Sequence, residues 1–209
     1  MKSSLHIRNI VLVAAVVLSA GLHAAQSVAD APDKVTPLPV GSAAPTRVVT
    51  TADGSFDLGE AIAHKPTILV FYRANWCGLG NRALAELRDN SVTYEALGFQ
   101  IIAISADTPE SIKPAIEKNR LNYTVLSDRG LSLSSAYGIA FRAPKDLVSS
   151  YARKGISLPS LPDEAGAPGL LVPTVFVVDR HGIIRWFYSD PKRNPTPHDL
   201  LSAAIKART

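Results

Sequence analysis

Short apolar runs bounded by polar residues predict the buried strands of this chain. Thr67 to Arg73 (TILVFYR) and Phe99 to Ser105 (FQIIAIS) are rich in β-branched and aromatic residues, as is typical of central strands covered on both faces. Thr124 to Leu126 is a shorter run of the same kind that ends at Ser127-Asp128. These three segments predict the centre of one sheet.

Two hairpins are predicted outside this central group. Arg47 to Thr51 and Ser55 to Leu58 flank an Asp-Gly pair, which favours a tight turn between antiparallel strands. Thr174 to Asp179 and Ile183 to Tyr188 are separated by the turn-like string RHG. The hairpins add antiparallel strands to the predicted sheet.

Apolar residues spaced three or four positions apart predict helices between the strands. One helix begins just after Cys77 and ends before Gly98, with a kink expected at Asn90-Ser91. A short helix is predicted from Leu131 to Tyr137. Strands and helices therefore alternate along most of the chain.

Two further helices have clear start signals. Thr108-Pro109 and Thr196-Pro197 each place a capping hydroxyl before a proline, which is favourable at the first helical position. The first of these helices is expected to run to about Asn119 and the second to about Ala207. Asp199 stands at the third helical position and predicts a capping box.

Two proline-rich segments break the alternation. Residues 25–45 contain four prolines among small residues and predict an extended leader rather than a packed element. Residues 142–169 also contain four prolines and predict an insertion, with a helical stretch from Lys145 to Lys154. The remainder of 46–209 predicts an α/β domain: a central mixed β-sheet flanked by helices on both faces, with an N-terminal hairpin and an insertion before the final hairpin.

The first residues have the pattern of a targeting segment. Lys2 and Arg8 precede an apolar run from Ile10 to Val17, and small residues follow to Ala24. The run is too short to span a bilayer, so residues 1–24 are interpreted as a signal peptide, with an uncleaved membrane anchor as the alternative. The prediction is a periplasmic or secreted protein with no stable membrane insertion after cleavage.

Charge and metal-ligand spacing exclude two functional classes. Removal of Lys2 and Arg8 with the signal peptide lowers the formal net charge from +4 to +2. So small a positive charge does not indicate nucleic-acid binding. His64, His181 and His198 are far apart in the sequence, and no second cysteine exists to complete a metal-binding spacing. We therefore expect no metal site and no cofactor.

Cys77 is the only cysteine of the chain and the main candidate for chemistry. It lies between a predicted buried strand and a predicted helix, where unpaired backbone N–H groups and the helix dipole stabilise a thiolate. Trp76 precedes it, and Gly78 and Gly80 allow close backbone approach and solvent access. These neighbours favour a reactive thiol, whereas the alternative is a buried and inert cysteine.

Two other residues are candidates for a supporting role. Arg73 ends the strand four positions before Cys77 and could place positive charge beside a thiolate, or its side chain could extend to solvent at the sheet edge. Pro173 opens the later strand and is either an ordinary strand-start proline or a cis-proline that faces the sulfur. In the second case Val172 could offer backbone hydrogen bonds to a bound chain.

Four strings occur in the order and spacing of one known family: FYRANWCGLGNRALAEL, IIAISADTPES, TVLSDRGLSLSSAYGIAFRAP and VPTVFVVDRHGIIRWFYSDP. From about Pro45 onward the chain resembles the peroxiredoxin-like branch of the thioredoxin-fold superfamily, the alkyl hydroperoxide reductase and thiol-specific antioxidant group. The resemblance implies thiol-based peroxide or disulfide chemistry. It also implies that Cys77 is the attacking cysteine and that Pro173 is the cis-proline.

The chain departs from that family's usual site at several positions. Gly78 and Gly80 stand where relatives often have proline and a second cysteine. Ala74 replaces a threonine or serine that binds peroxide, and Pro173 replaces an arginine that activates the thiolate. The resemblance therefore implies an attacking thiol without an internal thiol to resolve it.

The leading hypothesis is an exported single-cysteine thiol oxidoreductase with antioxidant, thiol-dependent peroxide-reducing character. Cys77 is the nucleophile, supported by Arg73, Trp76, Gly78 and Pro173, and an external thiol reductant resolves it. The alternatives are a redox-impaired thioredoxin-fold binding module and a thiol–disulfide reductase that also depends on an external thiol. The partners expected are a peroxide or disulfide substrate and that thiol, and a dimer is compatible with the sequence.

Overall fold

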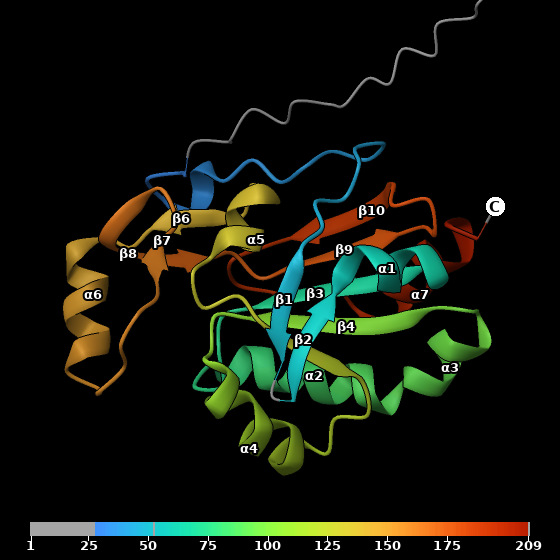
Figure 1. The fold of residues 1–209 in the computed structure, drawn as a ribbon, viewed down its shortest axis with the longest axis horizontal. Coiled ribbons are helices and arrows are strands. Elements are labelled where there is room, and N and C mark those ends of the chain that lie inside the picture. The colour runs from blue at the N-terminus through green and yellow to red at the C-terminus, as the bar shows by residue number, and fades with distance from the viewer. Residues whose placement is uncertain (1–27, 52, 209) are drawn as a thin grey trace, which may run out of the picture.

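In the part of the chain that the structure describes, seven strands form one mixed sheet in the order β10-β9-β3-β4-β5-β1-β2 (Figure 1). The computed structural model describes residues 28–51 and 53–208. The predicted signal peptide, residues 1–24, and the first residues of the predicted leader lie outside the described residues.

The centre of the sheet is parallel. β3 (Thr67–Tyr72) pairs with β4 (Gln100–Ser105), and β4 pairs with β5 (Thr124–Ser127). Every residue of β3 is buried, as expected of a strand with helices on both faces. The three predicted central strands are therefore confirmed.

Antiparallel strands extend the sheet on both sides. β9 (Thr174–Val178) pairs with β3 and continues into β10 (Ile184–Ser189). On the other side, β1 (Val48–Thr51) contacts β5 and pairs with β2 (Gly54–Asp57). Both predicted hairpins and the mixed sheet are confirmed.

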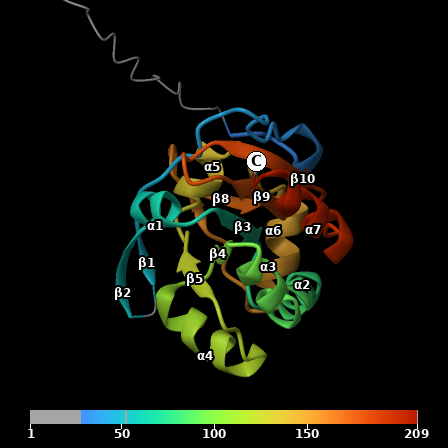
Figure 2. The ribbon, with the colours of Figure 1, turned by 90° about the vertical axis from the view of Figure 1, so that its right-hand side faces the viewer.

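Helices cover both faces of the sheet, as Figure 2 shows in a view turned by 90°. One face packs against α1 (Leu58–His64) and α5 (Ser132–Ala136). The helices that pack on the opposite face are α2 (Gly78–Asp89), α3 (Ser91–Ala96), α4 (Pro109–Asn119) and α7 (Pro197–Lys206). This arrangement follows from alternation along the strands, since successive side chains point to opposite faces.

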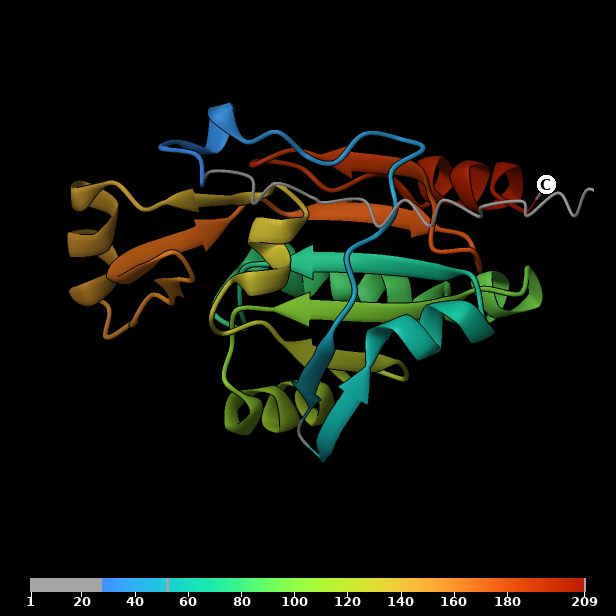
Figure 3. The same ribbon diagram turned by 45° about the horizontal axis from the view of Figure 1, so that its top comes forward.

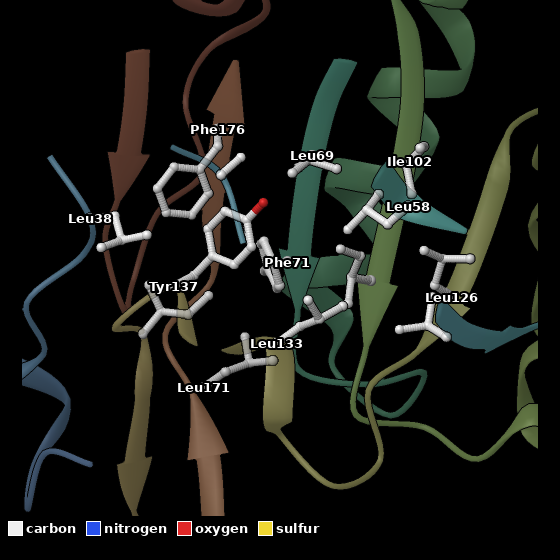
Figure 4. Close-up of a cluster of buried hydrophobic side chains, with 14 of the residues drawn as sticks. Leu38, Leu58, Leu69, Phe71, Ile102, Leu126, Leu133, Tyr137, Leu171 and Phe176 are labelled. Atoms are coloured by element: carbon white, nitrogen blue, oxygen red, sulfur yellow. The ribbon is translucent and has the colours of Figure 1, made fainter. Parts of the chain in front are cut away.

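The core on the first face is built around aromatic contacts. Tyr137, which ends α5, lies with its ring centroid 4.9 Å from that of Phe71 and 4.9 Å from that of Phe176 (Figure 4). Leu69 and Leu171 are buried in the same cluster. The contact joins β3, β9 and the segment that leads into the insertion.

Capping explains where the helices begin and end. Helix α1 was not among the predicted elements; it begins because the Asp57 carboxylate accepts hydrogen bonds from the N–H groups of Gly59 and Glu60. Helix α2 ends and α3 begins on either side of Asn90, and this interruption confirms the predicted kink. The predicted capping box of Thr196 and Asp199 is also present at the start of α7.

The predicted insertion, residues 142–169, contains more regular structure than its sequence indicates. Helix α6 (Lys145–Ala152) agrees with the predicted helical stretch. The strands β6 (Ala140–Arg142), β7 (Ser160–Leu161) and β8 (Glu164–Leu171) form a second sheet in the order β6-β8-β7. Figure 3 shows this unit beyond the end of the main sheet to which the arrowheads of β3 and β4 point.

Residues 28–45, which we call the N-terminal strap, are extended except for the short 3-10 helix η1 (Pro32–Lys34), and they pack against the domain. Leu38 is buried in the core, and its N–H donates to the Tyr137 carbonyl at 3.1 Å. The Gly41 N–H donates to the Ile184 carbonyl, and the Ile184 N–H donates to the Ser42 carbonyl. The expectation of an unpacked leader was therefore wrong for this part, because its backbone groups find partners in the β9–β10 hairpin.

Candidate functional site

Cys77 occupies the N-cap position of α2, directly beyond the carboxyl end of β3. Its N–H donates to the Ala74 carbonyl at 2.9 Å and its carbonyl accepts from the Asn81 N–H at 3.0 Å, so the backbone on both sides is fixed. The thiol is unpaired and half-buried. The structure thus places the sulfur at a helix N-terminus, where backbone N–H groups are not used within the helix.

Trp76 connects this turn to the insertion. Its ring centroid lies 4.7 Å from that of Tyr151 in α6, with the two ring planes at 50°. Leu147, Val148 and Leu158 of the insertion belong to the same apolar cluster. The insertion therefore packs against the residue next to the candidate nucleophile.

The two glycines after Cys77 differ in their surroundings. A β-carbon added to Gly78 meets no other residue within 4 Å, apart from its chain neighbours, and the residue is exposed. Gly80 is buried, and a β-carbon there would lie 3.4 Å from the Tyr72 ring. The solvent side of the turn is therefore at Gly78, while Gly80 faces β3.

Arg73 lies at the end of β3, and its guanidinium is directed to the loop after β10. One Nη donates to the Pro191 carbonyl at 3.2 Å, whereas the buried Nε–H finds no acceptor within residues 28–51 and 53–208. Arg73 therefore holds a loop near the site and keeps one donor uncommitted.

The structure corrects the interpretation of Pro173 as a cis-proline. The described residues contain no cis peptide bond, so the bond before Pro173 is trans. The Val172 N–H donates to the Ile139 carbonyl, and the Thr174 hydroxyl donates to the Val172 carbonyl, each at 2.9 Å. These bonds fix the extended segment before β9. They also occupy the N–H and carbonyl of Val172, the groups that a bound chain would have used.

Pro173 instead lines an apolar cavity between α2 and the start of α7. Tyr72, Ala83, Leu87 and Pro195 lie around the same cavity. The loop before α7 is attached to the site, because the Asn194 amide donates to the Leu79 carbonyl at 3.3 Å. Pro173 thus shapes the wall behind α2.

A buried carboxylate that is not among the residues selected from the sequence bonds to the Cys77 turn. The Asp107 carboxylate accepts hydrogen bonds from the Asn75 N–H at 2.9 Å and the Ser105 hydroxyl at 3.0 Å. Its place just past the end of the predicted strand Phe99 to Ser105, with only one residue between, is the signal that could have found it. Asp128 follows β5 in the same way, but its carboxylate accepts from Leu133 and Ser134 and caps α5.

In the part of the chain that the structure describes, no three His, Cys, Asp or Glu side chains gather as a metal site. Within those same residues, no helix has the length and apolar character needed to cross a membrane.

Comparison with protein families decides the relationship. The family model of the AhpC/TSA family matches residues 40–187, well over half of the chain. The chain belongs to the AhpC/TSA family. This confirms the resemblance that the four strings indicated.

A curated relative of this AhpC/TSA protein is the chloroplastic peroxiredoxin Q of Triticum aestivum, at 26% identity over 150 residues. The aligned part is 72% of this chain and 58% of the wheat protein, so the chain spans less than two thirds of that relative's length.

Solved structures agree on the fold. Peroxidoxin BcpB from Mycobacterium tuberculosis superimposes with a TM-score of 0.64 at 18% identity, covering 81% of this chain and 97% of that one. A yeast mitochondrial 1-Cys peroxiredoxin gives a TM-score of 0.58 at 13% identity, covering 78% and 73%. These likenesses, together with the sheet order, confirm the predicted thioredoxin-like α/β fold.

Proposed function

We propose that this AhpC/TSA protein is an exported single-cysteine thiol peroxidase, with Cys77 as nucleophile and an external thiol as reductant. The observation that carries the proposal is the half-buried, unpaired Cys77 at the N-cap of α2, beside a solvent-open Gly78. Backbone N–H groups at a helix N-terminus favour the thiolate, which is the form that attacks. Family membership and the peroxiredoxin relatives support the choice of peroxide as substrate.

The oxidising step forms one S–O bond and breaks one O–O bond. The Cys77 thiolate attacks the terminal oxygen of a hydroperoxide, and the alkoxide or hydroxide that leaves takes up a proton. The products are a Cys77 sulfenic acid and an alcohol or water. No residue other than Cys77 changes its covalent structure in this step.

The reductive steps need thiols from outside the chain, because Cys77 is the only cysteine. A first thiol attacks the sulfenic acid, which releases water and leaves a mixed disulfide on Cys77. A second thiol attacks that disulfide, which releases the oxidised reductant as a disulfide and restores the Cys77 thiol. The yeast 1-Cys peroxiredoxin with the same fold is described as resolved through glutathione and thioredoxin systems, which supports a reductant of this class.

The neighbouring residues have supporting roles in this proposal. The buried Nε of Arg73 supplies a donor and positive charge near the end of β3, where Ala74 carries no hydroxyl. Trp76 and the insertion shield one side of the sulfur, and Gly78 leaves the other side accessible. Pro173 closes the wall behind α2.

Export is part of the proposal and rests on residues 1–24. Their charged start, short apolar run and small residues are typical of a signal peptide, and they support a periplasmic or secreted location. Expression of the full chain with a C-terminal tag, followed by cell fractionation and N-terminal sequencing, tests it. Recovery of uncleaved protein in the cytosol contradicts it.

The catalytic proposal is tested by trapping the sulfenic acid. Purified protein is exposed to low-millimolar hydrogen peroxide with dimedone, and the adduct is located by mass spectrometry of peptides. We expect one adduct, on Cys77, and peroxide consumption that continues only when glutathione or thioredoxin is present. Cys77→Ser is the control and should show neither effect; an unmodified Cys77 in the wild-type protein would overturn the proposal.

A further inference from the structure

The Asp107 carboxyl is a buried acidic group at the same end of the sheet as Cys77. Asp107 lies two residues after the end of β4 and is 8% exposed. Its Oδ2 accepts from the Asn75 N–H at 2.9 Å and from the Ser105 hydroxyl at 3.0 Å, while its own N–H donates to that hydroxyl oxygen. Ser105 at the end of β4 therefore holds the carboxyl, and the same oxygen accepts from the turn before α2.

Asn75 is the residue through which this contact reaches the nucleophile. It stands inside the turn that the Cys77 N–H closes by donating to the Ala74 carbonyl. The Asn81 amide donates to the Asn75 carbonyl at 2.8 Å, and the Asn75 amide donates to the Ser111 carbonyl at 2.8 Å. Helices α2 and α4 thus hold two groups of Asn75, and Asp107 holds its N–H.

We infer that Asp107 is a positioning residue for Cys77. Its carboxyl fixes the Ala74–Cys77 turn by accepting a hydrogen bond from the Asn75 N–H, and its negative charge acts on the Cys77 thiol. The inference rests on the proposed function, in which Cys77 attacks a peroxide. A misplaced nucleophile lowers the rate of attack even when its chemistry is unchanged. A negative charge nearby disfavours formation of the thiolate.

The groups around Asp107 decide when it carries that charge. Burial raises the pKa of the Asp107 carboxyl, although the hydrogen bonds from Ser105 and Asn75 and the positive charge of Arg129 act in the opposite direction. Tyr72 also interacts with it, but burial raises the pKa of this phenol, so Tyr72 stays neutral. The carboxyl of Asp107 therefore ionises above the usual carboxyl range.

The test compares two variants at Asp107 in two reactions. Asp107→Ala removes the acceptor, and we expect its plateau rate of peroxide oxidation at high pH to fall about tenfold. Asp107→Asn keeps an oxygen for the Asn75 N–H, and we expect it to restore that plateau. In Asp107→Asn, the pH profile of Cys77 alkylation by iodoacetamide should show a single ionisation step, at a lower pH than in the wild-type protein.

Two further variants separate positioning from general stability. Asp128→Asn changes a second buried carboxyl that caps α5, and it should leave the alkylation profile and the oxidation plateau unchanged. Ser105→Ala leaves the Asp107 carboxyl in place but removes a hydrogen bond to its ionised form. In the pH profile of Cys77 alkylation, the step that comes from ionisation of Asp107 should then move to higher pH.

The outcomes separate this inference from the proposed function. If wild-type protein forms no sulfenic acid, the peroxidase proposal fails, and the alkylation profiles still decide whether Asp107 acts on Cys77. The inference is overturned if the Asp107→Asn and wild-type alkylation profiles superimpose. It is also overturned if Asp107→Ala retains the full oxidation plateau.

Discussion

A β-carbon placed on Gly80 would lie 3.8 Å from the β-carbon of Cys77. This separation is typical of the two β-carbons of a disulfide. Its closest contact, the Tyr72 ring at 3.4 Å, is an ordinary van der Waals distance, so the position has room for a side chain. The first turn of α2 thus retains the spacing for a second sulfur that the sequence does not supply.

Gly80→Cys is therefore expected to form an intramolecular disulfide with Cys77. Mild oxidation should lower the protein mass by two hydrogens and remove both free thiols in a thiol titration. Peroxide turnover should then continue with a dithiol reductant such as thioredoxin, because the new thiol can attack the Cys77 sulfenic acid.

The matched control is Gly130→Cys, which introduces a second cysteine whose nearest contact would be Ser132. This variant should retain two free thiols as a monomer under the same oxidation. Two free thiols in oxidised Gly80→Cys would contradict the geometry of the α2 turn.

The contact between Trp76 and Tyr151 predicts that the insertion stabilises the Cys77 turn. Tyr151→Ala removes the ring that lies 4.7 Å from Trp76. We expect a loss of about 1 kcal/mol in the free energy of unfolding, faster proteolysis between α6 and β7, and faster alkylation of Cys77. Tyr151→Phe keeps the ring and should behave as wild type; equal alkylation rates in all three proteins would show that the insertion does not shield the sulfur.

The buried hydroxyl of Tyr137 predicts a stabilising substitution. In the described part of the chain this oxygen has no hydrogen-bond partner, although the ring is completely buried between Phe71 and Phe176. Tyr137→Phe keeps the ring contacts and removes the cost of an unpaired hydroxyl, so we expect a gain of about 1 kcal/mol in urea unfolding.

Tyr123→Phe provides the opposite case, since the Tyr123 hydroxyl donates to the Leu84 carbonyl at 2.8 Å. This variant should lose about 1 kcal/mol. A loss of stability in Tyr137→Phe would mean that its hydroxyl is paired in solution.

Asp179 predicts a pH-dependent contribution to stability at the β9–β10 turn. Burial alone would raise its pKa, but hydrogen bonds from the Ile183 N–H, the Arg185 guanidinium and the His181 N–H together hold the pKa below the usual range. The folded state thus binds its proton more weakly than the unfolded state. The contribution to stability is present above the unfolded pKa and is lost as the pH falls through the folded pKa.

Asp179→Asn measures this contribution. At pH 7 we expect it to lower the free energy of unfolding by about 1 kcal/mol, because Arg185 is half-exposed and solvent screens part of the charge interaction. The difference between variant and wild type should shrink as the pH falls below 4 or so. A difference independent of pH would assign the effect to packing alone. Asp163→Asn, on the exposed β7–β8 turn, is the matched surface control and should leave the free energy of unfolding unchanged at pH 7.

The sequence predicts the elements whose residues act locally. The runs of β3 and β4 are long and apolar, and the Thr196 capping box is contained within four residues, so each was found from neighbouring positions alone. Cys77 was placed at a helix start for the same reason.

The elements that were missed depend on distant partners. β8 (EAGAPGLL) is rich in small residues and contains Pro168, yet it is a strand because β6 and β7 pair with it on both sides. The trans peptide bond before Pro173 belongs to a segment that a hydrogen bond from Val172 to the Ile139 carbonyl holds in place. The role of Asp107 depends on Asn75, which lies in another loop. Contacts of this kind have no signature in a local pattern.

The N-terminal strap has a consequence for the order of folding. Gly41 and Ser42 bond to Ile184, and Ala44 bonds to Gly182, so the strap docks on residues that are synthesised near the end of the chain. Contacts between segments so distant in sequence form late, since a long loop must be closed first. We therefore expect Leu38 to become fully buried only after the β9–β10 hairpin has formed.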